Sequence, residues 1–372
     1  MVMDKRSVNN PRYRRSDPIV PKRPRAGLER NDSIDEILRM KTLHDKFRSL
    51  NSKHKVRYSP IKMVGKGGFG QVFECTADVT NSGGYEMPQV VALKTETGSE
   101  IKLEMKVLLK LKNHNHFCEL YDFGQITPGY SFIVMTLLGP NLSTIRKKMP
   151  TKQFTVSTSI RAGLQMLMAI EALHGAGFIS RDVKPSNFAI GRPNGNRRMV
   201  YMIDFGISLV YKDQNGPVKL KRSEMTWRGT NRYCSLGHHK KHLPSPKDDV
   251  ESWFYSLMEL CVGELPWQYL GKHQKAETCK AKEVVRTTKR EYFLGSCPFE
   301  FDQILGLIDR MTRDSIVEYH KIYASLTRCL IRDKVDFKDP YDWEYMLSSY
   351  QCSSSTAASS DRIETLDKSL YQ

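Results

Sequence analysis

The chain has 372 residues, of which 40% are apolar and 10% aromatic, and it carries a formal net charge of +17. A chain of this length and composition can bury a large core, which excludes disorder throughout, and it contains no apolar run long enough to cross a bilayer. The basic excess predicts attraction to a polyanion, such as nucleic acid, a membrane surface or an acidic or phosphorylated protein, unless the lysines only keep the surface solvated.

The N-terminal region divides into two parts. In residues 1–30, arginines and lysines are interleaved with prolines, which predicts a disordered basic arm able to bind a polyanionic partner. Residues 31–57 begin with a capping candidate, Asp32 or Ser33, and continue with apolar residues at helical spacing as far as Leu50. They are expected to form an amphipathic helical extension, which either packs on the rest of the chain or binds a partner.

A glycine-rich stretch follows between two runs of β-branched residues. Gly65, Gly67 and Gly70 occupy the pattern G-x-G-x-x-G, and the chain then returns into a second predicted strand rather than a helix. Glycines permit tight turns and let backbone N–H groups reach phosphate oxygens, so the loop predicts a β-hairpin lying over a nucleotide. Its other members are Lys66, Gly68 and Phe69. Taken alone, the stretch is also compatible with a plain hairpin turn.

The next predicted strand, "VVALK", ends in Lys94 and is followed by an amphipathic helical pattern. An ammonium group on a rigid strand can hold nucleotide phosphates, and a carboxylate on a facing helix can hold the ammonium in place. Glu104 is the expected carboxylate because it precedes the apolar pair Leu108 and Leu109 by about one helical turn. Glu100 stands at the start of the helix, where a capping role fits better.

The segment "RDVKPSN" predicts a catalytic loop. Asp182 can accept the proton of an attacking hydroxyl, Lys184 can neutralise a transferring phosphoryl group, and Asn187 can hold a magnesium ion through its carbonyl oxygen. Further along the chain, Asp204 leaves an apolar strand and meets Gly206, which adds a second hard oxygen ligand for magnesium.

Helical patterns dominate the later part of the chain. The stretch "STSIRAGLQMLMAIEALHGAG" has apolar residues at helical spacing, and "DVESWFYSLMELCVG" is apolar on nearly all sides, as expected of a buried helix. A small β-rich lobe therefore precedes a larger, mainly helical lobe in an α+β fold. Residues 347–372 are rich in serine and poor in large apolar residues, which predicts a flexible tail.

In their order along the chain, these motifs resemble the eukaryotic protein kinase fold over residues 58–346. The resemblance implies a small lobe with one main helix over about 58–136 and a mainly helical lobe over about 140–346. The segments "FIVMTLLGPNL", "KPSNFAIGR", "WRGTNRYCS", "GELPW" and "DPYDWEYM" are similar to the casein kinase one superfamily, and most similar to its tau-tubulin kinase-like branch with the divergent nematode members. This similarity implies a serine/threonine protein kinase that uses ATP and Mg²⁺.

The resemblance also places residues around the adenine ring of the nucleotide. Val72 and Ala92 would cover the ring from above, and Ala189 would lie beneath it. Met135 would guard the rear of the pocket, and Leu138 would offer backbone hydrogen bonds at the hinge between the lobes.

Two further residues would support the catalytic loop. By resemblance, Thr230 would brace Asp182 and Lys184, and Asp249 at the start of the buried helix would hold the backbone of the loop.

One residue departs from the family pattern. Ser180 stands where active kinases of this kind carry a histidine, which supports the loop without touching phosphate. Because Lys94, Asp182 and Asp204 are all present, we expect an active kinase. The alternative is a nucleotide-binding pseudokinase that acts as a scaffold.

Several basic residues fall beside the segment that follows Asp204, which predicts substrates with acidic or phosphorylated sites. They are Lys219, Lys221, Arg222, Arg228 and Arg232. Arg232, in the matching "RY" pair, is the expected anion contact. The alternative is that these side chains only form a solvated face.

The eight cysteines are scattered singly, which predicts reduced thiols and no structural metal. The N-terminus lacks the apolar core of a secretory signal, so we expect a cytoplasmic protein, with the nucleus as a second compartment. We expect a monomer. A nucleic-acid partner is not expected, because no RNA-binding signature is present.

Overall fold

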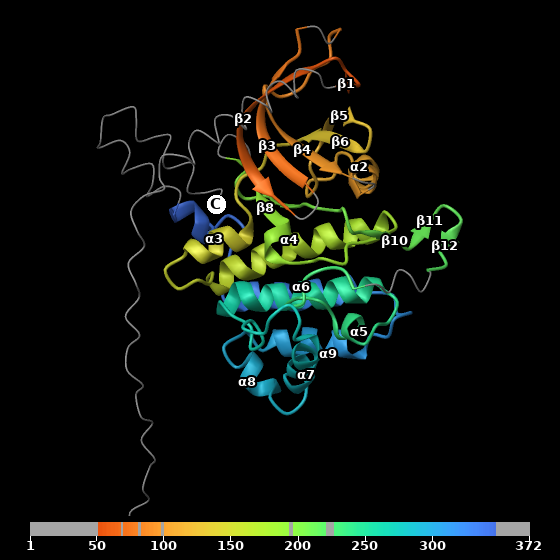
Figure 1. The fold of residues 1–372 in the computed structure, drawn as a ribbon. Coiled ribbons are helices and arrows are strands. Elements are labelled where there is room, and N and C mark those ends of the chain that lie inside the picture. The colour runs from red at the N-terminus through yellow and green to blue at the C-terminus, as the bar shows by residue number, and fades with distance from the viewer. Residues whose placement is uncertain are drawn as a thin grey trace, which may run out of the picture. The chain divides into compact units, whose positions relative to one another are not determined.

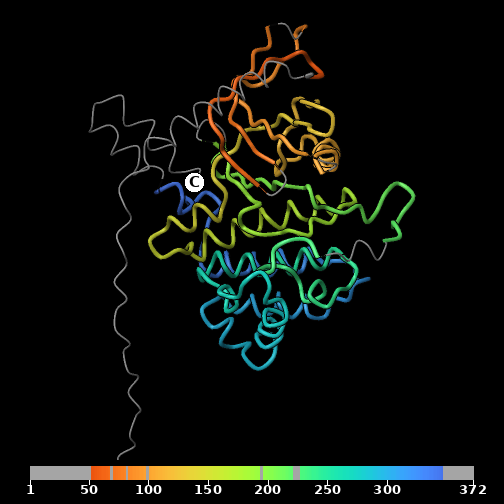
Figure 2. The backbone as a smooth tube through the Cα atoms, in the orientation of Figure 1, coloured from red at the N-terminus to blue at the C-terminus, as the bar shows by residue number. Residues whose placement is uncertain are grey.

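The computed structural model describes residues 51–67, 70–80, 83–97, 100–192, 196–220 and 227–346. Figures 1 and 2 show a sheet-rich small lobe followed along the chain by a mainly helical large lobe. Some predicted features lie outside the described residues, namely the basic arm 1–30, the helical pattern up to Leu50, the loop residues Gly68 and Phe69, and the tail 347–372. Within the described part, no helix combines the length and the apolar character needed to cross a membrane.

The small lobe is one antiparallel sheet with the strand order β1-β5-β6-β4-β3-β2. The strands are β1 (Asn51–Ser52), β2 (Arg57–Lys66), β3 (Gly70–Asp78), β4 (Val90–Thr97), β5 (Leu120–Thr127) and β6 (Tyr130–Met135). Helix α2 (Glu100–Lys110) packs against the sheet and buries Ile101, Val107 and Leu108. Val72 pairs with Lys94 across β3 and β4, so the glycine-rich strands lie directly beside the predicted phosphate-binding lysine.

The start of the small lobe differs from the prediction. The helical extension expected over residues 31–57 is wrong for its described end, because β1 pairs with β5 and β2 begins at Arg57. The buried carboxylate of Asp122 accepts hydrogen bonds from the hydroxyls of Ser52 and Tyr58, the latter at 2.6 Å. These tertiary contacts stabilise the extended backbone at Ser52 and Tyr58, beyond the end of the helical pattern at Leu50. The small lobe therefore includes residues 51–57.

The large lobe is built around two helices that pack side by side, α4 (Val156–Gly175) and α6 (Pro246–Val262) (Figure 1). Gly163 allows their close approach, since a Cβ at this position would lie 2.8 Å from Leu257. The indole N–H of Trp253 donates to the Gly163 carbonyl at 2.8 Å. The other helices are α3 (Leu142–Lys148), α5 (Leu236–His239), α7 (Lys275–Val284), α8 (Arg290–Leu294), α9 (Glu300–Arg310) and α10 (Tyr319–Arg332).

Short strand pairs and one short 3₁₀ helix shape the loops between α4 and α6. The elements are β7 (Phe178–Ile179) with β10 (Leu209–Val210), β8 (Phe188–Ile190) with β9 (Val200–Met202), β11 (Lys212–Asp213) with β12 (Gly216–Pro217), and η1 (Pro185–Asn187). Strands β7 and β9 contact α4. This packing brings the Asp182 loop and the Asp204 turn to the same end of the large lobe.

An ion pair joins the two lobes. Arg192, which follows β8, places Nη1 at 3.0 Å from Oε1 of Glu74 in β3. Lys62 in β2 approaches the other carboxylate oxygen at 3.6 Å. The Glu74 side chain is buried, whereas a third of the Arg192 side chain is exposed.

Candidate active site

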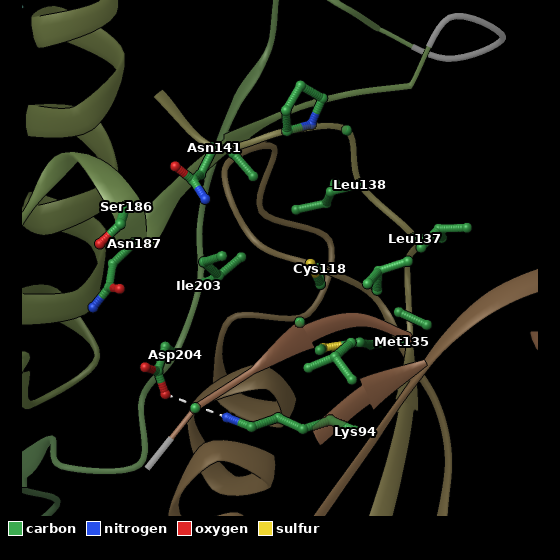
Figure 3. A pocket seen from close by; sticks show the side chains of 18 of the residues that line it. Lys94, Cys118, Met135, Leu137, Leu138, Asn141, Ser186, Asn187, Ile203 and Asp204 are labelled. Carbon is green, nitrogen blue, oxygen red and sulfur yellow. Dashed lines mark hydrogen bonds and ion pairs between the residues drawn. The ribbon is translucent and has the colours of Figure 1, made fainter. Parts of the chain in front are cut away.

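A cavity of about 440 Å³ lies between the two lobes. The predicted residues that line it are Gly65, Lys66, Gly67, Gly70, Val72, Ala92, Lys94, Glu104, Met135, Leu138, Asp182, Lys184, Asn187, Ala189 and Asp204. Figure 3 shows Met135 and Leu138 on one side of the cavity and Asn187 and Asp204 on the other. The cavity thus has an apolar side suited to a flat ring and a charged side suited to phosphates.

Lys94 forms the charged centre of the cavity. Its Nζ lies 2.5 Å from Oε2 of Glu104 in α2 and 3.3 Å from Oδ1 of Asp204 (Figure 3 draws the second contact). Burial favours the neutral amine, but the two carboxylates outweigh burial and raise the pKa of Lys94 above its usual range. Lys94 therefore stays charged, and its ammonium is held where strand and helix meet.

Glu96 is a residue of this region that the motifs did not single out. Its side chain is almost fully buried, and neither carboxylate oxygen has a hydrogen-bond partner among the described residues. A Cβ at Gly206 would lie 3.6 Å from Oε1 of Glu96 and 3.9 Å from Oδ1 of Asp204, so the two carboxylates border the same glycine. Burial raises the pKa of Glu96 to about 7, although Lys94 opposes the rise.

We expect Glu96→Gln to raise the free energy of unfolding at pH 8 by on the order of 1 to 3 kcal/mol. The pKa of Glu96 in the folded chain, about 7, lies above the ordinary value of 4.5, so the parent loses stability as pH rises through 7. The amide does not titrate, and the difference should disappear below pH 4.5. Urea unfolding across this range measures the effect, with the exposed Glu86→Gln as control. Parallel pH profiles for the parent and Glu96→Gln would refute the assignment.

The predicted catalytic loop forms a compact set of contacts. Nζ of Lys184 lies 2.6 Å from Oδ2 of Asp182, and the hydroxyl of Thr230 donates to Oδ1 of Asp182 at 2.8 Å. Nζ of Lys184 also donates to the Thr230 hydroxyl at 3.1 Å. The contacts that the resemblance implies for Thr230 are therefore present, and both carboxylate oxygens of Asp182 are oriented.

The residues expected to hold a divalent cation fit that task. The amide nitrogen of Asn187 donates to the carbonyl oxygen of Asp182 at 3.0 Å, which leaves the amide oxygen of Asn187 for a cation. Asp204 is partly exposed and has a φ of +67°, a left-handed conformation that is uncommon for non-glycine residues. Carboxylate and amide oxygens suit a hard cation that completes its shell with water and phosphate. In the part of the chain that the structure describes, no group of three or more His, Cys, Asp or Glu side chains is arranged to hold a metal ion by itself.

Asp249, in the first turn of α6, holds the backbone of the loop. Its Oδ2 accepts from the N–H of Ser180 at 2.6 Å, and its Oδ1 accepts from the N–H of Arg181 at 2.9 Å. His174, at the end of α4, contacts the same carboxylate at 2.9 Å and was not anticipated, because nothing in its helical pattern distinguishes it. The Ser180 side chain is buried, and among the described residues its hydroxyl accepts a hydrogen bond from the N–H of Asp182 alone, at 3.4 Å. Asp249 thus holds the start of the loop through backbone N–H groups.

Arg232 does not line the cavity. Its Nη1 lies 3.0 Å from Oε1 of the buried Glu259, and its Nη2 donates to the carbonyl of Gln268 at 3.1 Å. About a third of the Arg232 side chain remains exposed. If it binds a substrate anion as predicted, its guanidinium would contact that anion and Glu259 at the same time. Lys219 and Arg228 are exposed, whereas Lys221 and Arg222 lie outside the described residues.

Comparison with known proteins reveals the relatives of the chain. Residues 58–315 match the model of the protein kinase domain family. A Dictyostelium discoideum protein named as a serine/threonine-protein kinase is 31% identical over 79% of this chain and 58% of its own length. The serine/threonine-protein kinase spe-6 of Caenorhabditis elegans is 30% identical over 79% of this chain and 76% of its own.

A second Caenorhabditis elegans relative, which carries the name casein kinase I, is 32% identical over 77% of this chain and 83% of its own length. The matched region thus covers most of the two nematode proteins but little more than half of the Dictyostelium protein. The chain belongs to the protein kinase family and, within it, to the casein kinase one superfamily of serine/threonine kinases.

Proposed function

We propose that the chain transfers the γ-phosphoryl group of ATP, bound with Mg²⁺, to serine and threonine hydroxyls of proteins, and that it prefers sites near acidic or phosphorylated residues. The observation that carries the proposal is the meeting of Lys94, Asp182 and Asp204 at one cavity, although they come from distant parts of the chain. Such convergence supplies the positioning and charge stabilisation on which phosphoryl transfer depends.

Asp182 is placed to receive the proton of the acceptor hydroxyl. In the transfer step, the acceptor oxygen forms a bond to the γ-phosphorus while the bond from this phosphorus to the bridging oxygen breaks, and ADP leaves with that oxygen. The hydroxyl proton passes to Asp182. Lys184, 2.6 Å away, offsets negative charge on the transferring group, and Thr230 keeps the Asp182 carboxylate oriented.

The other residues position the nucleotide. Lys94, held by Glu104, would contact the phosphates of bound ATP, and the backbone of the glycine-rich strands, which lines the same cavity, would cover them. When bound, Mg²⁺ would neutralise phosphate charge, with Asn187 and Asp204 supplying its protein oxygens.

The preference for acidic sites is supported by the basic residues near Thr230, among which Arg232 is partly exposed. We expect Arg232→Gln to raise KM for a phosphorylated peptide by about threefold to tenfold relative to its unphosphorylated counterpart, because one charged contact to the peptide is lost. Steady-state assays with radiolabelled ATP and the two peptides measure the ratio. Arg313→Gln, which removes an arginine beside Asp314 after α9, serves as control. An unchanged ratio would argue that Arg232 serves only Glu259.

A nucleotide-binding scaffold remains the second candidate, and Ser180 is the observation that favours it. A scaffold would bind ATP without transferring phosphate, so binding and turnover measured on one preparation separate the two functions. The backbone contacts at this position support activity, because the N–H groups of Ser180 and Arg181 bind Asp249 without any contribution from the side chain of residue 180. Placement in the tau-tubulin kinase-like branch and a polyanionic partner for the basic arm 1–30 stay predictions.

A further inference from the structure

Lys282, in α7, is a buried lysine whose donors are all used. Its side chain is fully buried, and Nζ lies 3.0 Å from the carbonyl oxygen of Asn231 and 2.6 Å from that of Cys234. Two further partners are Nε2 of His239, at 3.2 Å, and Sγ of Cys234, at 3.8 Å. An ammonium has three N–H donors and no acceptor, so the four partners occupy all of its donors. Burial lowers the pKa of His239 to about 3, which leaves the imidazole neutral and able to accept.

The surroundings of Lys282 lack a paired carboxylate. Among the described residues, Glu251 is the carboxylate whose charge favours the protonated form of Lys282. Its Oε1, however, already accepts from Nη2 of Arg286 at 2.8 Å and from the N–H of Leu236 at 2.6 Å. The rings of Tyr255 and Trp267 lie 5.0 Å and 5.4 Å from Nζ and supply cation–π contacts. Burial lowers the pKa of Lys282 to about 8. Burying this charge costs free energy, and two of the contacts that offset the cost, the carbonyls of Asn231 and Cys234, belong to one short segment.

That segment is a turn directly joined to the catalytic loop. The N–H groups of Tyr233 and Cys234 both donate to the carbonyl of Thr230 at 3.1 Å, which closes the turn. The Thr230 hydroxyl, in turn, contacts Asp182. The indole N–H of Trp267 donates to the carbonyl of Arg232 at 2.7 Å. Together with the two bonds from Lys282, this contact holds the outward carbonyls of the turn against the α6–α7 region.

We propose that Lys282 is a positioning residue for the protein acceptor. Lys282 fixes the turn 230–234, so that Thr230 contacts Asp182 and the other residues of the turn can contact the substrate. The inference rests on the proposed kinase function, because only an acceptor hydroxyl at Asp182 gives the turn a substrate to contact. Lys282 itself touches neither ATP nor the acceptor. Its effect should therefore fall on the acceptor peptide and spare the nucleotide, whose pocket does not include the turn.

The first test is Lys282→Met, which keeps the volume of the side chain but removes its donors. We expect KM for an acidic peptide to rise about tenfold, which corresponds to the loss of one or two net hydrogen bonds, while KM for ATP changes less than twofold. Ile322→Ala in α10, a buried change remote from the turn, controls for general loss of stability. Equal rises in both KM values, or the same pattern in Ile322→Ala, would overturn the proposal.

A second variant covers the case in which Lys282→Met does not fold. Asn231 donates from its side chain to the hydroxyl of the buried Thr278 at 3.0 Å, so Asn231→Ala removes another contact between the same turn and α7. As for Lys282→Met, KM for the acidic peptide is expected to rise while KM for ATP stays nearly unchanged.

Amide hydrogen exchange tests the placement of the turn without requiring turnover. In Lys282→Met, the amides of Tyr233 and Cys234 should exchange at least about tenfold faster than in the parent, while those of α4 stay protected. Unchanged exchange at these amides would overturn the proposal even if activity fell. Conversely, faster exchange in Lys282→Met, combined with a parent that transfers no phosphate, would refute the kinase function and leave Lys282 as the residue that fixes the turn.

Discussion

Asp182→Asn is expected to lower kcat by about 10³-fold, because an amide cannot take the proton of the acceptor hydroxyl. The substitution preserves shape, and the retained oxygen can still accept from Thr230 as Oδ1 does in the parent, at 2.8 Å. ATP affinity should stay within about twofold, since in the proposed mechanism Lys94 and the glycine-rich strands, rather than Asp182, would hold the nucleotide phosphates. Transfer of labelled phosphate from ATP to casein measures kcat, and calorimetry measures nucleotide binding.

The matched control is Asp213→Asn, which makes the same chemical change at an exposed position in β11. Its rate should equal that of the parent. A parent that is no faster than Asp182→Asn, while still binding ATP, would replace the kinase assignment with the scaffold alternative. A small loss in Asp182→Asn alone would instead mean that the acceptor proton leaves by another route.

Lys94→Met is expected to lower kcat/KM by about 10²- to 10³-fold and also to destabilise the fold by about 3 kcal/mol. The first effect follows from the loss of the only ammonium group bonded to both Glu104 and Asp204 within the described chain. The second follows because Glu104, fully buried, loses its counter-ion. Burial raises the pKa of Glu104, so the lost stability should be smaller at low pH, where the carboxyl takes up a proton, and larger at high pH.

The double variant Lys94→Met/Glu104→Gln separates the two effects. It removes the uncompensated carboxylate and should recover most of the lost stability, but it should not recover phosphate transfer. Lys106→Met, on the exposed side of α2, is the matched control and should change neither quantity. Recovery of activity in the double variant would show that Lys94 contributes through folding alone.

The residues that line the cavity could be predicted because their motifs are local. Asp182, Lys184 and Asn187 share one loop, and Lys94 ends a strand whose pattern is clear in the sequence. The residues of each motif also have a chemical role of their own, so the type of reaction could be inferred without knowing that the motifs lie around one cavity. The pairing of Lys94 with Glu104 was accessible as well, since helical spacing distinguishes Glu104 from Glu100.

The features that were missed depend on contacts between distant residues. Strand β1 exists because Ser52 reaches Asp122, 70 positions away, and a two-residue strand has no periodicity of its own. In sequence, Lys282 resembles any lysine of a charged helix, and only the turn 230–234 and two aromatic rings make it a buried residue. The pairing of Arg232 with Glu259 likewise depends on how α6 packs beneath the turn.

The ion pair between Arg192 and Glu74 affects a stage of the reaction cycle that is separate from the chemical step. Release of ADP from a cleft between two lobes requires the lobes to part, and the contact of Arg192 with Glu74 on the opposite lobe opposes this opening. The Glu74 carboxylate is buried, so its separation from Arg192 is costly, and dissolved ions can reach the pair chiefly from the arginine side. Higher ionic strength should consequently ease the dissociation of ADP, because it screens this pair from its exposed side.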